Sequence, residues 1–527
     1  MQVRHRKPNE TAQQLMPLLA LGVALIVSNR YFSFVDNEVR SLDFASLPAR
    51  TLFSRFFYGG GQLETSPLYG VILHFWLRLT AGNFEYLRIP AILIYLAGLF
   101  LLGRAAREFE GQAGASTIVW LGVLWPFGFH YGRLDEPDGF AFFLVAGLTL
   151  AYLRFVEEQD FGRSAALFLF GALLLWTTFF GWAVLLFLVI DQLLRRRAQE
   201  PTIPVRVMAR TIVLWVAAYI PVARPMRREF IAGANFHHGI AALASNFALH
   251  VYNLFVSESV GPWHWQQSVP AGLAVLVCIV LVFVNESGLS RRFLIYGAVL
   301  LIFMALSGTL LSRHTFIVAP WVLLPVAIGI GSIKSRLARP VLAVSLFTIG
   351  MIGWSGMYSR TYYSEPQFLD PWVQIAGNAA DKIHTGAGLV SNSRPLLFYL
   401  TYALRVPTGA GPTKFEGLIP DSAQWPNVAT PDQWLSSGHP ILPAMIWIRG
   451  TSDPQTEGPT AKLMNDAGDT LDRSCGSRES RLTMPDRGYL WKQKYLRETP
   501  EEIWRIEIRQ YDCASPNSIE IYPIPRP

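Results

Sequence analysis

A short charged segment, residues 131–140 (YGRLDEPDGF), interrupts two of the most apolar parts of the chain. It supplies the guanidinium of Arg133 and the carboxylates of Asp135, Glu136 and Asp138. A carboxylate can accept a proton from a reacting hydroxyl or amine, and a guanidinium can hold phosphate oxygens through paired hydrogen bonds. Charged side chains at membrane depth are costly and usually functional. The segment is therefore a candidate wall of a reaction site.

The same segment also has a structural explanation. The residues Pro137-Asp138-Gly139 are typical of a turn that caps the helix after it. For Glu136 and Asp138 this capping role is favoured. For Asp135 a functional role is favoured instead.

Basic residues form a second group that could take part in chemistry. Arg224 lies in the segment VARPMRREF with Arg227 and Arg228, and Arg313 is followed by His314 in LSRHTF. Bidentate hydrogen bonds from such arginines would hold a phosphate group. For Arg227 and Arg228 the alternative is that they reach lipid headgroups or bind an external domain.

Most of these residues must be positioned by membrane-spanning helices. The chain has 527 residues, of which 51% are hydrophobic and only 16% charged, and many apolar runs reach the length needed to cross a bilayer. The main runs are 15–27, 89–103, 115–131, 140–153, 164–190, 211–223, 268–284, 293–312, 315–332 and 340–357. We expect about eleven transmembrane helices, with two short ones hinged near 177–181. The segment 66–81 is short and charged, and is expected to lie in the outer interface.

Arginine-rich loops set the expected orientation. Arg4, Arg6 and Lys7 place the N-terminus in the cytoplasm under the positive-inside rule, and a basic loop at 195–210 fits the same side. The acidic residues that follow the first span then share the outer face with the segment 131–140. The net charge of +7 comes largely from these short loops, which argues against a nucleic-acid partner.

The chain divides into an expected transmembrane domain, residues 1–357, and an extracytoplasmic α/β domain, residues 358–527. The segments GAGLVSNS, AMIWIR and RIEIRQY are expected to form strands, and DPWVQIAGNAADKIH a helix. Cys475 and Cys513 both belong to this domain, where an oxidising compartment would let them pair. The alternative, two buried thiols, stays open. Residues 230–266 are amphipathic and expected on the outer interface.

Several motifs occur in an order that resembles the GT-C glycosyltransferases of the protein O-mannosyltransferase and 4-amino-4-deoxy-L-arabinose transferase group. That family has an acidic pair after the first span, a Pro-Pro-Leu-like segment, a Gly…Glu…Arg turn and an Arg-x-x-Asp motif. The corresponding residues here are Asp36-Asn37 with Glu38 displaced by one, Ser66-Pro67-Leu68 with a single proline, and Gly82, Glu85 and Arg88. The last motif is Arg133 to Asp135, in which the spacing is tighter than in some relatives.

The resemblance implies a reaction and a location. A sugar on a polyprenyl phosphate would be transferred outside the inner (plasma) membrane to a glycan, lipid or protein. Asp36 would be the general base, with Asp135 and Glu38 as the other catalytic carboxylates. The donor phosphate would be bound by Arg313, Arg224, Arg133 and His314. No cofactor is required, although a divalent ion at Asp36 and Asp135 is an alternative.

Two other classes of protein compete with this interpretation. A lipid or sugar transporter, or flippase, would also have many spans and buried charges, but it predicts repeated halves and charged residues near the middle of spans. The sequence has neither feature. A structural or assembly protein would leave the two acidic groups unexplained. The transferase interpretation is therefore favoured.

Overall fold

The computed structural model describes residues 8–29, 31–58, 66–233, 239–284, 288–333, 335–360, 363–364, 369–405, 425–438, 440–450, 454–475, 477–485, 491, 494–495 and 505–514. Contacts divide the chain into two compact units. The helical unit comprises Met1–Arg30 and Leu47–Ser364, and the C-terminal unit comprises Tyr31–Ser46 and Glu365–Pro527. Residues 31–46 therefore group with the C-terminal unit, although they follow the first apolar helix.

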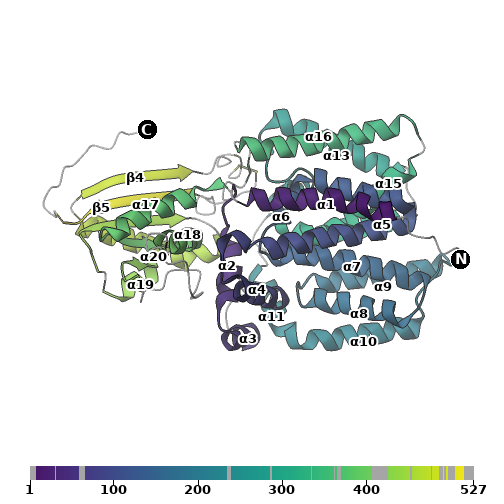
Figure 1. The fold of residues 1–527 in the computed structure, drawn as a ribbon, viewed down its shortest axis with the longest axis horizontal. Helices are drawn as coiled ribbons and strands as arrows, with labels where there is room; N and C mark the ends of the chain where they lie inside the picture. The colour runs from purple at the N-terminus through teal and green to yellow at the C-terminus, as the bar shows by residue number, and fades with distance from the viewer. Residues whose placement is uncertain are drawn as a thin grey trace. The chain divides into compact units, whose positions relative to one another are not determined.

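The helical unit is built from helices joined by short turns, and several of its longer helices run side by side (Figure 1). Its elements are α1 (Pro8–Ser28), α3 (Ala49–Tyr58), α4 (Pro67–Thr80), η1 (Phe84–Tyr86), α5 (Ile89–Leu124), α6 (Pro126–Tyr131), α7 (Pro137–Glu157), α8 (Phe161–Leu175), α9 (Gly181–Arg197), α10 (Val205–Tyr219), η2 (Ile220–Val222), α11 (Ala223–Gly233), α12 (Ile240–Val256), α13 (Trp265–Val284), α14 (Gly288–Leu306), η3 (Arg313–Ile317), α15 (Ala319–Ser332) and α16 (Ala338–Ser359).

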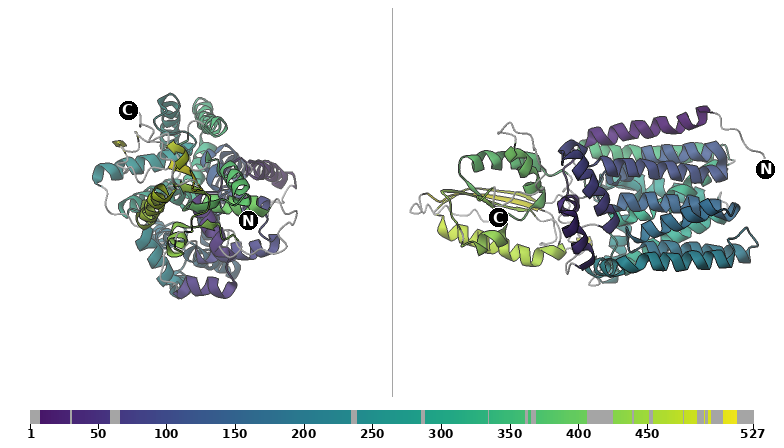
Figure 2. Two further views of the ribbon diagram at one scale, coloured as in Figure 1. Left: turned by 90° about the vertical axis from the view of Figure 1, so that its left-hand side faces the viewer. Right: turned by 60° about the horizontal axis from the view of Figure 1, so that its bottom comes forward.

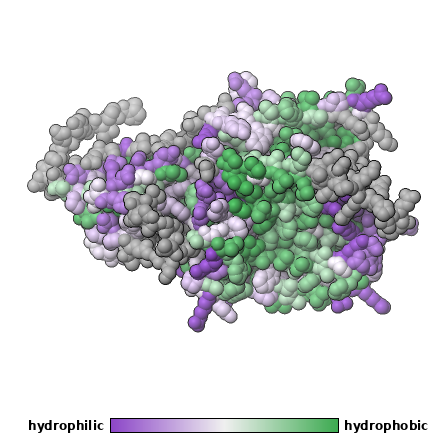
Figure 3. Space-filling view, viewed as in Figure 1, coloured by the Kyte–Doolittle hydropathy of each residue, from purple (hydrophilic) through white to green (hydrophobic). Residues whose placement is uncertain are grey.

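Four helical stretches of the described residues are long and apolar enough to cross a membrane: Phe84–Glu108, Pro137–Glu157, Val205–Arg228 and Pro340–Ser359. Shorter apolar helices accompany them. On the face seen in Figure 3, apolar residues cover the middle of the helical unit and hydrophilic residues gather toward its ends. The predicted fold class, a helical polytopic membrane protein with a C-terminal α/β domain, is confirmed. The total of about eleven spans stays a prediction.

The helix α5 contains the predicted span 89–103 and the first part of the predicted span 115–131, and these two stretches lie against one another. A Cβ atom on Gly122 would lie 2.7 Å from the Leu99 side chain, and one on Gly103 would lie 3.5 Å from the carbonyl oxygen of Ala115. Along a straight helix, residues 103 and 115 would be about 18 Å apart. The chain therefore reverses within α5, as two separate spans require.

The long apolar run after residue 164 is divided into two helices, as predicted. α8 ends at Leu175 and α9 begins at Gly181. A Cβ atom on Gly181 would lie 3.2 Å from the carbonyl oxygen of Leu174, so glycine permits the close approach at this bend. The break in the helix lies where Thr177 and Gly181 interrupt the apolar run.

The segment 66–81 forms α4, whose ends follow from its sequence. The Ser66 hydroxyl accepts a hydrogen bond from the Tyr69 amide at 3.4 Å, and Pro67 starts the helix. Ala81 adopts a left-handed conformation, φ 51°, that ends it. Both α3 and α4 run across the direction of the long helices (Figure 2). This direction fits a segment that lies in the interface rather than one that spans the bilayer.

The C-terminal unit contains one five-stranded sheet in the order β2-β1-β3-β5-β4. Strand β1 is parallel to β2 and β3, whereas β5 is antiparallel to β3 and β4. The predicted helix and strands are confirmed. The elements are α2 (Asp36–Ser46), α17 (Trp372–His384), β1 (Gly388–Ser391), α18 (Arg394–Arg405), β2 (Val428–Ala429), α19 (Pro431–Ser436), β3 (Ala444–Gly450), α20 (Pro454–Ser474), β4 (Ser477–Pro485) and β5 (Arg505–Asp512).

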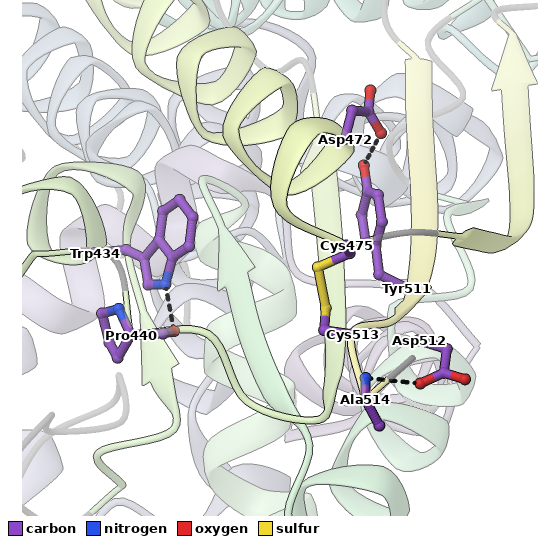
Figure 4. The surroundings of a disulfide bond; sticks show 8 residues. All are labelled: Trp434, Pro440, Asp472, Cys475, Tyr511, Asp512, Cys513 and Ala514. Carbon is purple, nitrogen blue, oxygen red and sulfur yellow. Dashed lines mark hydrogen bonds between the residues drawn. A yellow bond between two sulfur atoms is a disulfide. The ribbon is translucent and has the colours of Figure 1, made fainter. Parts of the chain in front are cut away.

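A disulfide links the end of α20 to the end of β5. Cys475 and Cys513 are bonded to one another, so the pairing that the sequence left open is present (Figure 4). Next to the disulfide, the Tyr511 hydroxyl on β5 donates a hydrogen bond to Oδ1 of Asp472 on α20 at 2.8 Å. Cys475 and Tyr511 belong to a buried apolar cluster that includes Trp447. The disulfide therefore fixes the end of α20 against the buried side chains that pack on the sheet.

Replacing Cys475 and Cys513 together with alanine is expected to lower the free energy of unfolding of the C-terminal unit by about 2–4 kcal/mol. The bond joins residues 38 positions apart, and its loss restores conformational freedom to that loop in the unfolded chain. Calorimetric melting of the full-length protein measures the effect. The matched control is Cys278→Ala, which removes a buried free thiol from the helical unit. Equal melting of the C-terminal unit with and without the disulfide would contradict the prediction.

Candidate active site

A charged turn, residues 132–136, joins α6 to α7. Pro126 begins α6 and Pro137 begins α7, where the fixed φ of proline favours the helix and its missing amide hydrogen costs nothing. Arg133 and Asp135 are 0% exposed, and Glu136 is 6% exposed. Charges buried to this degree need partners within the protein. The turn is therefore a region of concentrated, enclosed charge.

Glu136 interacts with Arg313 rather than capping α7. It occupies the N-cap position but makes no side-chain cap hydrogen bond, and its Oε2 lies 3.6 Å from Arg313 Nε. The capping role favoured for Glu136 is therefore wrong, because a partner about 180 residues away in the chain orients the carboxylate. Asp138 does lie in the first turn of α7, where a helix favours negative charge.

Arg133 is held inside the helical unit. Its Nη1 donates a hydrogen bond to Ser28 Oγ at 3.4 Å, and its guanidinium lies 5.9 Å from the centre of the Phe129 ring. The charges of Arg133 and of Arg88, which is 1% exposed, both act on the ring of His130. Arg88 and Arg133 come from two of the four motifs that carried the family resemblance. The structure brings both arginines into one buried region.

Glu258 adds a carboxylate that sequence reasoning missed. The Tyr131 hydroxyl donates to Glu258 Oε1 at 2.6 Å, and the Ser364 amide donates to the Glu258 carbonyl oxygen at 2.8 Å. The pKa of Tyr363 is raised, mainly because the hydroxyl is buried. The charge of Arg133 opposes this increase in the pKa, and the charge of Glu258 adds to it. Tyr363 is thus close to both charges. The only signal in the sequence was a lone carboxylate in the apolar stretch LFVSESVGPW, which we expected to lie on the outer interface.

Hydrogen bonds on both sides of Arg313 fix its turn. The ring of His314 pairs through Nδ1 with the Thr309 carbonyl oxygen at 2.7 Å, and Ser312 Oγ accepts from Asn253 Nδ2 at 3.0 Å. The Arg313 side chain is 29% exposed. Its backbone is therefore held in place while part of its side chain stays accessible, which suits an arginine that binds a phosphate.

His250 on α12 contacts Ser312, the residue before Arg313. Its burial predicts that folding stability falls in acid. Its Nδ1 lies 2.8 Å from Ser312 Oγ. Burial lowers the pKa of His250 to about 4, and the charge of His314 lowers it as well. Because the unfolded chain binds this proton near pH 6.5, folding stability should fall between pH 6.5 and about 4, by up to about 3 kcal/mol. Thermal unfolding across this range measures the loss, which should be smaller in His250→Gln. An identical pH dependence in both proteins would contradict the assignment.

The arginines of α11 are placed differently from Arg313. Arg224 and Arg227 are exposed, and Arg228 Nη2 donates to the carbonyl oxygen of Phe56 at 3.1 Å. Arg228 therefore ties α11 to α3. In the described part of the chain no ion pair joins Arg224 to the acidic turn. Arg224 stays a candidate on the sequence argument alone.

The other acidic group lies in the C-terminal unit, at the start of α2. Asp36 Oδ2 lies 2.5 Å from Arg40 Nε, and Glu38 Oε2 accepts a hydrogen bond from the Val35 amide at 3.1 Å. Asp36 is 5% exposed and Glu38 0%. Both carboxylates thus have fixed orientations. Because Asp36 and Asp135 belong to different units, the expectation that they reach one sugar stays a prediction.

Two further features concern ligands. An apolar cavity of about 60 Å³ in the helical unit is lined by side chains that include Trp125, Leu254, Cys278, Leu323 and Ile349. A cavity of this kind takes hydrocarbon rather than water. Among the described residues, no group of three His, Cys, Asp or Glu side chains could hold a metal ion.

Two solved structures of ArnT from Cupriavidus metallidurans share the fold of this chain. The apo structure matches with a TM-score of 0.56 and 12% sequence identity, covering 96% of this chain and 98% of ArnT. The structure bound to undecaprenyl phosphate matches with a TM-score of 0.52 and 11% identity, covering 94% and 97%. No family model and no curated protein sequence matches the chain. The predicted resemblance is confirmed at the level of the fold.

Proposed function

We propose that the protein is a membrane glycosyltransferase that moves a sugar from a polyprenyl-phosphate carrier to an acceptor outside the cytoplasm. The observation that carries the proposal is the match to ArnT over 96% of the chain, one of whose structures holds undecaprenyl phosphate. A likeness of fold does not by itself specify a reaction. The chemistry of the buried charged residues supplies the second support.

The donor's phosphate would bind at the turn of Arg313. When the bond between the anomeric carbon and the phosphate oxygen breaks, the bonding electrons pass to the leaving polyprenyl phosphate. A guanidinium placed where this charge develops lowers the barrier. Arg313 is proposed for that role, with Arg224, Arg133 and His314 as further donor-side residues. The apolar cavity beside Trp125 offers hydrocarbon contacts for part of the prenyl chain.

The acceptor would be activated by a carboxylate. We propose that Asp36 removes the proton from the acceptor's hydroxyl or amine, whose lone pair then forms the new bond to the anomeric carbon. Asp135 would orient the acceptor, and Glu38 would support the start of α2 through its bond to the Val35 amide. The proton ends on Asp36 and returns to solvent after the product leaves.

The proposal includes a location. The protein would lie in the inner (plasma) membrane with its N-terminus in the cytoplasm and the C-terminal unit outside. The basic loops and the four spanning stretches support this placement. Reagents that label introduced cysteines from outside whole cells would test it at positions near 36 and 135. Labelling at only one of the two positions would contradict the shared outer face.

An assay with the purified full-length protein in nanodiscs tests the function. Polyprenyl phosphates carrying different labelled sugars are supplied with glycan, lipid and peptide acceptors, with and without added divalent cations and chelator. Formation of a labelled product and free polyprenyl phosphate is expected with at least one pair. Movement of the intact donor across the bilayer of proteoliposomes, with no product, would instead support the transporter or flippase alternative.

A further inference from the structure

We propose that Tyr399, on α18 of the C-terminal unit, is a positioning residue for Asp36. The inference rests on the proposed function, because it takes Asp36 as the base. It goes further by giving α18, a helix distant from Asp36 in the chain, a part in positioning the base.

The start of α2 is attached to α18 by a buried hydrogen bond. The amide of Phe34 donates to Tyr399 Oη at 2.8 Å, although the two residues are 365 positions apart in the chain. Phe34 is 2% exposed, and its ring lies 5.0 Å from that of Phe398 and 6.3 Å from that of Tyr399. Phe34 is only two residues before Asp36. The contact therefore acts on the backbone that leads directly into the candidate base.

Neighbouring hydrogen bonds make this backbone rigid. The Ser33 hydroxyl donates to the carbonyl oxygen of Asp370 at 2.5 Å, which is a second attachment within the C-terminal unit. The Val35 amide donates to Glu38 Oε2 at 3.1 Å, and Arg40 holds the carboxylate of Asp36. The amides of Phe34 and Val35 are thus each satisfied by a different partner. The direction in which α2 begins is set by these contacts.

Removing one of these partners should move Asp36 rather than unfold the unit. Without the Tyr399 oxygen, the buried Phe34 amide loses the acceptor described above and its backbone must shift to find another. A shift of about 1 Å in a reacting group can reduce a rate by about a hundredfold. The substitution Tyr399→Phe keeps the ring and its packing against Phe34. It therefore isolates the hydrogen bond.

The experiment compares Tyr399→Phe with Tyr511→Phe in the full-length enzyme. Tyr511→Phe makes the same chemical change in the same unit and removes the bond to Asp472, away from α2. Tyr399→Phe is expected to lower kcat about ten- to a hundredfold, with the donor's KM unchanged. Tyr511→Phe should leave kcat within about twofold of the unaltered enzyme. Melting temperatures of both variants are recorded to separate positioning from stability.

Combining Tyr399→Phe with Asp36→Asn supplies the decisive measurement. If Tyr399 acts through Asp36, it should have no further effect on the residual rate of the Asp36→Asn enzyme. An unchanged kcat in Tyr399→Phe, or the same fold-loss in the Asp36→Asn background, would overturn the inference. Full activity of Asp36→Asn alone would instead overturn the proposed role of Asp36.

A second variant covers the case in which Tyr399→Phe does not fold. Ser33→Ala removes the bond to the Asp370 carbonyl oxygen on the other side of Phe34. It is expected to lower kcat several-fold and, like Tyr399→Phe, to lose this effect in the Asp36→Asn background. Normal turnover of Ser33→Ala beside a non-folding Tyr399→Phe would overturn the inference.

Discussion

Asp36→Asn is expected to reduce sugar transfer by about a hundred- to ten-thousandfold, the range in which a general base contributes to a rate. Asparagine has nearly the same shape as aspartate but cannot accept the acceptor's proton. The substitution keeps an oxygen beside Arg40, whose Nε forms an ion pair with Asp36 Oδ2 at 2.5 Å in the native protein. The loss should therefore appear in kcat, with the KM of the donor little changed.

The measurement is product formation by the purified full-length protein over a range of donor concentrations. The matched control is Asp43→Asn, the same substitution two turns further along α2. It should leave turnover within about threefold of the unaltered enzyme. Comparable turnover of Asp36→Asn and Asp43→Asn would remove Asp36 as the base and would turn attention to Glu38 and Asp135.

Arg313→Ala is expected to reduce transfer by about a hundred- to a thousandfold, because the charge that develops on the leaving phosphate would lose a fixed guanidinium. Arg313→Lys should recover part of the rate, since lysine keeps the charge but not the paired hydrogen bonds. The control is Arg227→Ala, an exposed arginine on α11 that was not placed in the donor site. Equal effects of Arg313→Ala and Arg227→Ala would argue for a general attraction of anionic lipid.

The ion pair with Glu136 gives this prediction an internal check. Arg313→Ala also removes a partner from Glu136, whose Oε2 lies 3.6 Å from Arg313 Nε. If the loss of activity arose only from that disturbed carboxylate, adding Glu136→Gln would restore the rate. Binding of phosphate by Arg313 predicts no such recovery. Restoration of the rate in the double variant would therefore contradict the donor-site assignment.

Local patterns in the sequence were enough to predict much of the architecture. Apolar runs of membrane length identified the helical unit, and the interruption at Thr177–Gly181 separated α8 from α9. Short apolar runs identified β1 and β3, which are buried on both faces, and alternating apolar residues identified β5. Two cysteines in one small domain indicated that a disulfide could form. Each of these features depends on residues that are near one another in the chain or on a simple count.

The partners of the charged groups were decided by the tertiary structure. The sequence identified Arg133, Asp135 and Arg313, but not that Glu136 faces Arg313 or that Tyr131 donates to Glu258. A buried charge is satisfied by whichever group the packing of helices brings beside it, and no local pattern encodes that neighbour.

The chain alone determined that this is a helical membrane protein carrying two acidic groups and a small α/β domain. Only the tertiary structure decided that the residues around Asp36 belong with that α/β domain, through the bond from the Phe34 amide to Tyr399. The physical reason is that helices and strands form from interactions within short segments, whereas a contact between residues 34 and 399 depends on how distant segments pack.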